Sequence, residues 1–183
     1  FLLSVSPQAL KRFDRECQAL KTINHGSIPE VYACGTSPDG LSFMVMEFCE
    51  GQTLQQILEQ KSRLSPEFVR NMAISVSECL SSTHAAGLVH RDIKPSNIMV
   101  ADEEGFRVKL LDFGIAHATA GDASLTGTNE VLGSLAYLSP EHLTSKELDA
   151  RSDLFSLGCV MYRALSGADA VDESKGVAGV MRI

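Results

Sequence analysis

The five cysteines of this chain form no Cys-x-x-Cys pair and recur at no fixed spacing. This excludes the common sequence patterns of a zinc site and of a disulfide framework, and it favours a reducing, intracellular environment. No apolar run is long enough to cross a membrane, the start of the chain has no signal-peptide pattern, and we find no repeat or low-complexity tract. Basic residues are too few for a nucleic-acid-binding face, because 16 Lys and Arg stand against 23 Asp and Glu, a formal net charge of −7.

The rest of the composition is that of an ordinary globular protein, 44% hydrophobic and 21% charged over 183 residues, enough for one domain or parts of two lobes. Capping residues and helical periodicity predict helices that begin at Ser6-Pro7, at the capping box Thr53-x-x-Gln56, at Ser65-Pro66 and near Ser152. Apolar stretches predict strands at Phe1–Val5 (the tail of a strand), Glu30–Gly35, Leu41–Phe48, Asn97–Val100 and Arg107–Leu111. This order predicts an α+β chain, in which a small strand-and-helix part precedes a mainly helical part and a hinge lies near Met46–Gly51.

One string of eight residues carries the most specific chemical signal, His90-Arg91-Asp92-Ile93-Lys94-Pro95-Ser96-Asn97. It matches the pattern H-R-D-x-x-x-x-N of a phosphoryl-transfer catalytic loop. Such a transfer needs a carboxylate that orients a hydroxyl and accepts its proton, for which Asp92 is the candidate. It also needs a lysine that offsets charge on the moving phosphoryl group (Lys94) and an amide oxygen that ligates Mg²⁺ (Asn97). On these residues the chain resembles the protein kinase family, and Lys94 points to its serine/threonine branch.

Asp112-Phe113-Gly114 follows the catalytic loop, directly after a predicted strand. By resemblance, Asp112 is the main Mg²⁺ ligand, Phe113 packs under the regulatory helix and Gly114 permits the backbone turn. The next stretch, Gly114–Ala136, is rich in Gly, Ala, Ser and Thr and shows no periodicity, which is typical of a functional loop.

The end of that loop resembles the substrate-docking part of the family and closes with Ser139-Pro140-Glu141, where members usually have Ala-Pro-Glu. Ser134 stands where these kinases usually carry a threonine that bonds to the catalytic aspartate and lysine. Asp153 resembles the buried aspartate that accepts backbone N–H bonds from the turn at His90 and Arg91. A helix N-terminal carboxylate facing the helix dipole is the alternative for Asp153, and both can hold at once.

The first predicted helix and the predicted hinge supply the candidate nucleotide-binding residues. Glu16 resembles the regulatory-helix glutamate that pairs with a strand lysine in the family, and an unrelated exposed glutamate is the alternative. Met46 resembles the gatekeeper, while the Glu47 carbonyl and the Cys49 N–H would face the adenine edge. A plain apolar strand end is the alternative for these three residues.

Arg91 suggests control by phosphorylation, because an arginine beside the catalytic aspartate can pair with a phosphate on the loop and order it. Thr126 and Thr128 are the preferred acceptors, with Ser124 and Thr119 behind them. The histidines outside the catalytic loop have no partner arrangement that we recognise in the sequence, so we interpret them as structural or solvated.

Two family features are not found in the sequence, the G-x-G-x-x-G loop and the strand with its phosphate-binding lysine. Phe1-Leu2-Leu3 resembles the residues just after that lysine, and the chain ends where the family continues with further helices. One of those helices supplies an arginine partner to the position of Glu141, so we expect Glu141 to lack that partner or to be exposed. We therefore expect a partial small lobe at residues 1–48, an incomplete large lobe at 49–183, and weak or no activity of this polypeptide itself.

The resemblance implies a serine/threonine protein kinase that uses ATP with Mg²⁺ (or Mn²⁺). The implied partners are protein substrates with Ser or Thr, ATP and a homodimer for autophosphorylation, with no nucleic acid and no membrane segment in this chain. The implied location is cytoplasmic for this domain, in a full-length protein that could be membrane-anchored. Two other classes stay open. A pseudokinase or scaffold is opposed by the intact catalytic and metal positions, and a small-molecule phosphotransferase by Lys94 and the docking segment.

Overall fold

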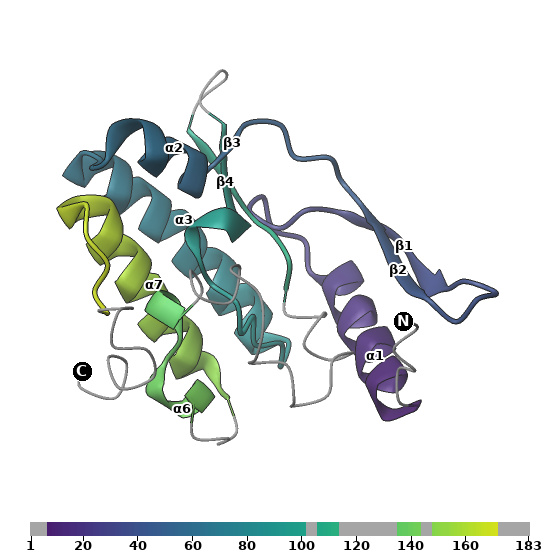
Figure 1. Cartoon of the computed structure of the whole chain (residues 1–183). Helices are drawn as coiled ribbons and strands as arrows, with labels where there is room; N and C mark the ends of the chain where they lie inside the picture. Colours follow the sequence, from purple (N-terminus) through teal and green to yellow (C-terminus); the bar gives the residue numbers. More distant parts are fainter. Residues whose placement is uncertain (1–6, 102–105, 114–134, 144–147, 172–183) are drawn as a thin grey trace.

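The structure is a computed structural model that describes residues 7–101, 106–113, 135–143 and 148–171. Its elements follow in the order α1 (Pro7–Thr22), β1 (Val31–Thr36), β2 (Ser42–Met46), β3 (Gln52–Thr53), α2 (Leu54–Lys61), α3 (Pro66–Ala85), η1 (Pro95–Asn97), β4 (Ile98–Ala101), β5 (Arg107–Leu110), η2 (Leu135–Tyr137), α6 (Pro140–Leu143) and α7 (Ala150–Ser166). In Figure 1, α1 and the β1–β2 hairpin lie on one side of the molecule, and α2, α3 and α7 gather on the other. The predicted order, strands with one helix before a mainly helical part, is confirmed.

Side-chain caps explain where the helices begin. The Thr53 hydroxyl accepts a hydrogen bond from Gln56 N at 3.2 Å, and the Gln56 side chain accepts one from Thr53 N at 2.9 Å, which is the predicted capping box. Ser65 caps α3, also as predicted. Helix α7 begins before the predicted Ser152, because Asp149 accepts a backbone N–H bond and serves as its cap. Among the described residues, no helix is both long and apolar enough to cross a membrane.

The strands form two antiparallel sheets, one of β1 and β2 and one in the order β3-β4-β5. The sequence does not predict β3, because two residues are too few to show alternation. The chain enters β3 through Gly51, whose φ is +123° and where an added Cβ would lie 2.4 Å from the carbonyl oxygen of Val100. Only glycine allows this close approach, so Gly51 sets how the segment after β2 meets β4.

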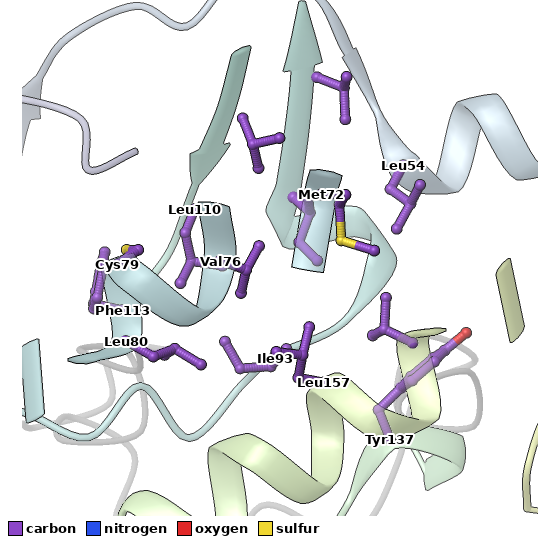
Figure 2. Close-up of a cluster of buried hydrophobic side chains, with 14 of the residues drawn as sticks. Leu54, Met72, Val76, Cys79, Leu80, Ile93, Leu110, Phe113, Tyr137 and Leu157 are labelled. Carbon is purple, nitrogen blue, oxygen red and sulfur yellow. The ribbon is translucent and has the colours of Figure 1, made fainter. Parts of the chain in front are cut away.

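The core lies between α3 and its neighbours. The predicted inner face of α3 is buried throughout, at Val69, Met72, Val76, Leu80 and Thr83. Figure 2 shows Met72, Val76 and Leu80 of this face with side chains of α2, β5 and α7, namely Leu54, Leu110 and Leu157. Ile93 and Phe113, which flank the candidate catalytic residues, belong to the same cluster at 2% and 4% exposure. The candidate site is therefore built directly on the core.

Candidate active site

Two polar side chains of the segment 90–97 converge on the Asp92 carboxylate. Asp92 Oδ2 accepts a hydrogen bond from Asn97 Nδ2 at 2.9 Å and lies 2.8 Å from Lys94 Nζ. Asn97 Nδ2 also donates to the backbone oxygen of Asp92, at 2.9 Å. Pro95 opens the short helix η1, which turns the chain so that residues five positions apart can meet. The side chains of Asp92 and Lys94 are 20% and 25% exposed, so this carboxylate is held by partners and is still open to solvent.

The turn that carries Asp92 is anchored by Asp153 of α7. Asp153 is 1% exposed and accepts hydrogen bonds from the backbone N–H groups of His90 and Arg91, both at 2.8 Å. These are the two bonds that the resemblance led us to expect. Its Oδ2 also lies 2.7 Å from Nε2 of His84, near the end of α3. Asp153 stands in the first turn of α7, where the helix dipole favours a carboxylate, so the two interpretations hold together.

His90 fills the space behind this turn as a neutral imidazole. Its Nε2 lies 2.9 Å from the Leu111 carbonyl oxygen, and its Nδ1 accepts a bond from Asp92 N at 3.2 Å. A carbonyl can only accept and a backbone N–H can only donate, so the ring proton sits on Nε2. Burial of His90 lowers its pKa, which favours the same neutral form. The ring packs on Phe113 with 4.7 Å between centroids.

Asp112 reaches the site through the strand that precedes it. The N–H of Leu111 donates to the Asn97 carbonyl oxygen at 2.8 Å, so Asp112 follows a residue that is bonded directly to Asn97. Asp112 is exposed, and its φ of +54° lies in the left-handed region, which is costly for a residue with a side chain. The fold thus brings a carboxylate and an amide oxygen, both ligand types that Mg²⁺ prefers, to neighbouring segments.

Glu16 of α1 faces the catalytic loop. It is 4% exposed, and its Oε1 accepts a hydrogen bond from Arg91 Nη1 at 3.1 Å. The interpretation of Glu16 as an exposed helical residue is therefore wrong. The sequence does not predict this contact. The partners that it does predict, a lysine for Glu16 and a loop phosphate for Arg91, are not among the described residues and stay predictions.

The candidate hinge follows the last residue of β2, Met46. The Glu47 carboxylate lies 2.6 Å from Lys109 Nζ of β5 and accepts a bond from Glu30 N at 3.1 Å. The hydrogen bond from Lys109 lowers the pKa of Glu47. Cys49 is half-buried, with its thiol 3.8 Å from the Glu47 carbonyl oxygen, and burial raises its pKa. The Glu47 side chain thus ties the hinge to β5, and the Glu47 backbone N–H donates to the Glu30 carbonyl oxygen at 2.8 Å. The contact of the Glu47 carbonyl and the Cys49 N–H with adenine stays a prediction.

The candidate docking segment packs against the start of α7. Ser152 Oγ donates to Glu141 Oε1 at 2.7 Å, and Ser156 Oγ donates to the Tyr137 carbonyl oxygen at 2.6 Å. The bond from Ser152 lowers the pKa of Glu141. Glu141 is partly buried and bonded to Ser152, so the expectation of an exposed Glu141 is wrong, whereas the lack of the family's arginine partner stays a prediction. A nearby serine in α7 bonds to its carboxylate.

A family model described as a protein kinase domain matches residues 4–181 of the chain. The chain belongs to the protein kinase family. The serine/threonine-protein kinase PknB of Mycobacterium leprae is 40% identical over 168 residues, which are 90% of this chain and 27% of that protein. A probable serine/threonine-protein kinase of Streptomyces coelicolor is 41% identical over 169 residues, 90% of this chain and 25% of that protein. The chain thus spans about a quarter of the length of these curated relatives.

A solved structure shows the same protein kinase fold. The PknI kinase domain of Mycobacterium tuberculosis matches with a TM-score of 0.72 and 25% identity, over 92% of this chain and 61% of that chain. The predicted fold class, a kinase-like α+β fold with few strands in the small lobe and a mainly helical large lobe, is therefore confirmed.

Several residues that we predict for the kinase site lie outside the described residues. They are Gly114, Ser134 and the candidate phosphate acceptors Thr126, Thr128, Ser124 and Thr119. Their roles stay predictions.

The sequence analysis does not single out three polar residues that contact the candidate site, His84, Lys109 and His142. His84 meets Asp153 across 69 positions, and His142 Nε2 lies 3.2 Å from the Arg91 carbonyl oxygen across 51 positions. No spacing rule connects residues so far apart, so only tertiary structure reveals these two contacts. The orientation of Lys109 could have been predicted from the sequence. It alternates with the buried residues of β5, so its side chain has to point away from the core.

Proposed function

We propose that this chain forms the catalytic centre of a serine/threonine protein kinase, which transfers the γ-phosphoryl group of ATP to Ser or Thr hydroxyls of proteins. The observation that carries the proposal is the convergence of Lys94 and Asn97 on a partly exposed Asp92. The two relatives, a serine/threonine-protein kinase and a probable one, support the same activity. Residues 1–48 would form part of the small lobe and residues 49–183 part of the large lobe.

Asp92 would orient the substrate hydroxyl and receive its proton. Lys94 and Asn97 both occupy Oδ2, so we assign Oδ1 to the incoming hydroxyl. The hydroxyl oxygen forms a bond to the γ-phosphorus as the bond from that phosphorus to the ADP oxygen breaks, and the hydroxyl proton passes to the carboxylate. Lys94 offsets the charge of the moving phosphoryl group. Positioning and charge stabilisation then supply most of the rate.

Asn97 and Asp112 fit a divalent cation, Mg²⁺ or Mn²⁺, that is held together with ATP. Both bonds from Asn97 to Asp92 use its amide nitrogen, so its amide oxygen is the atom that can ligate the cation. The described residues contain no group of three or more His, Cys, Asp or Glu side chains that could hold a metal by themselves. A two-ligand site completed by phosphate oxygens and water is what Mg²⁺ commonly uses in kinases, where it neutralises phosphate charge.

The hinge backbone would bind the adenine, with Met46 as gatekeeper, the Glu47 carbonyl as acceptor and the Cys49 N–H as donor. The ion pair between Glu47 and Lys109 supports this role because it ties the hinge to the strand that leads to Asp112.

Regulation would act on Arg91. A phosphate on Thr126 or Thr128 would compete with Glu16 for its guanidinium, and it would free Glu16 for the nucleotide site. Ser134 would contact the catalytic residues from the docking side.

The polypeptide of 183 residues would have weak or no activity by itself. The same proposal includes a homodimer for autophosphorylation. It also includes a cytoplasmic location for the domain, in a protein that can be membrane-anchored. A pseudokinase or scaffold is the second candidate, and one observation favours it, because Arg91 engages the glutamate that an active kinase directs to the nucleotide.

Transfer of labelled phosphate from Mg·ATP to the protein and to a Ser/Thr peptide library tests the proposal. Four samples are compared, namely this chain, the full-length protein, its Asp92→Asn variant and its Asp39→Asn variant, a matched change in an exposed turn. We expect labelling by the full-length protein and by Asp39→Asn only. A silent full-length protein, or equal labelling by Asp92→Asn, would favour the scaffold.

A further inference from the structure

We propose that His142 is a positioning residue of the catalytic loop, which holds the peptide group from which Asp92 extends. The inference rests on the proposed function, because its importance lies in how the Asp92 carboxylate is presented to a substrate. His142 itself is part of α6, in the docking segment.

The peptide group between Arg91 and Asp92 is held at both of its polar ends. Its carbonyl oxygen, that of Arg91, lies 3.2 Å from His142 Nε2. Its N–H, that of Asp92, donates to His90 Nδ1 at 3.2 Å. Arg91 also has φ +68°, a left-handed conformation that persists in a non-glycine residue only where the surroundings impose it. His142 and His90 therefore resist rotation of the peptide plane that sets the direction of Asp92.

The hydrogen bonds of His142 define a single orientation and a single tautomer of its ring. The backbone N–H of Ser139 lies 3.2 Å from His142 Nδ1, and an N–H can only donate, so Nδ1 is an acceptor. The proton of the neutral ring is then on Nε2, where it can donate to the Arg91 carbonyl, which can only accept. Ser139 is fully buried, and its Oγ lies 2.7 Å from the same Nδ1. One imidazole thus joins Ser139 to the catalytic loop by directed bonds.

This link makes the direction of Asp92 depend on the place of the docking segment. The neighbouring residue, Glu141, is bonded to Ser152 of α7, so α6 is itself fixed to the helix that anchors the loop. If a docked substrate displaced α6, the His142 side chain would pass this movement on to the Arg91 carbonyl. Sequence reasoning treated His142 as structural or solvated, and the geometry points to this more specific role.

Three substitutions of His142 in the full-length protein separate its two bonds. His142→Gln can place an amide N–H near the position of Nε2 and keep the bond to Arg91. His142→Asn keeps an acceptor near Ser139 but is too short to reach Arg91, and His142→Phe keeps the ring shape with neither bond. With a peptide from the Ser/Thr library, we expect kcat to fall roughly tenfold in the Asn and Phe variants, in line with one lost hydrogen bond. The Gln variant should stay within about threefold of the wild type, and the KM for ATP should be unchanged in all.

A merely structural role predicts a different result, in which thermal stability falls while kcat per folded molecule stays constant in the Phe variant. That result, or equal losses of kcat in the Gln and Phe variants, would overturn the proposal. Amide hydrogen exchange at Asp92, measured by NMR without nucleotide, gives a second readout that needs no catalysis. We expect faster exchange in the Phe and Asn variants than in the Gln variant and the wild type.

The two readouts also separate this inference from the proposed function. A wild-type protein that transfers no phosphate contradicts the kinase proposal, and the exchange rates then decide alone whether His142 holds the Asp92 peptide. Equal exchange at Asp92 in all four proteins would overturn the role of His142, whatever the activity.

Discussion

Oε1 of Glu16 lies 3.1 Å from Nη1 of Arg91, and this ion pair joins helix α1 to the loop that carries Asp92. The Glu16 side chain is 5% exposed and that of Arg91 is 26% exposed, so water screens the pair weakly. Removing the arginine would take away the guanidinium that donates a hydrogen bond to this buried carboxylate. We expect Arg91→Met to lower the free energy of unfolding by about 2 kcal/mol and Glu16→Gln by about 1 kcal/mol, measured by urea denaturation.

The double variant tests whether these two residues act on each other. Once Glu16 is neutral, Arg91→Met removes a weaker interaction. The loss of unfolding free energy in the double variant should therefore be smaller than the sum of the single losses by about 1 kcal/mol. Strict additivity would show that the contact contributes nothing to stability.

Asp153 is the residue on which we expect the catalytic loop to depend most for its stability. Its buried carboxylate accepts the N–H bonds of His90 and Arg91 and meets His84. Asp153→Ala would leave the buried N–H of His90 and the partly buried N–H of Arg91 without this acceptor, so we expect a loss of about 3 kcal/mol in unfolding free energy. Asp14→Ala, on the exposed side of α1, is the matched control and should change stability by less than about 0.5 kcal/mol. Equal losses in the two variants would contradict the anchoring role.

The parts of the fold that could be predicted are those with a local cause. Ser65 and the periodic face of α3 specify that helix within its own sequence. Strand β3 has no such cause, because Gln52 and Thr53 are a strand only through pairing with Val100 and Met99. Strand β3 therefore depends on a tertiary contact, which the local sequence pattern does not predict.

The same distinction applies to the site. Asp92 and Asn97 could be identified as candidate site residues because they share one short motif. Asp112 could be identified because it stands at the expected distance behind that motif. The pairing of Glu16 with Arg91 spans 75 positions, and the family pattern did not suggest it. The sequence identifies the candidate residues of the site. Only the tertiary structure shows which of them bond to each other.

Gly51 offers a test of how tightly the hinge is joined to β4. Its φ of +123° is unfavourable for any side chain, and an added Cβ would lie 2.4 Å from the Val100 carbonyl oxygen. We expect Gly51→Ala to cost about 2 kcal/mol or more, because the backbone of β4 has to move. At Gly26 an added Cβ meets no atom within 4 Å, so Gly26→Ala should be close to neutral. Thermal unfolding of the two variants makes the comparison, and similar losses would contradict the geometry.

Because the imidazole of His90 is buried, we expect the folded protein to become less stable as the pH is lowered. Burial holds its pKa in the folded state below the ordinary value of about 6.5. As the pH drops from about 7 towards 5, the unfolded chain takes up a proton at this residue and the folded protein does not, so the unfolded state gains stability. The groups Glu47 and Glu141 have lowered pKa values, so they lose their stabilising effect only at more acidic pH, below their ordinary value of 4.5.

His90→Gln isolates this contribution, because a glutamine amide can still donate to the Leu111 carbonyl but does not titrate. Unfolding free energies of both proteins are measured by urea denaturation at pH 7 and pH 5. We expect the loss between these pH values to be smaller in the variant, since the effects of all other histidines cancel in the comparison. An equal loss in both proteins would mean that His90 takes up its proton as readily in the fold as in the unfolded chain, which a fully buried ring between Leu111 and Asp92 should not do.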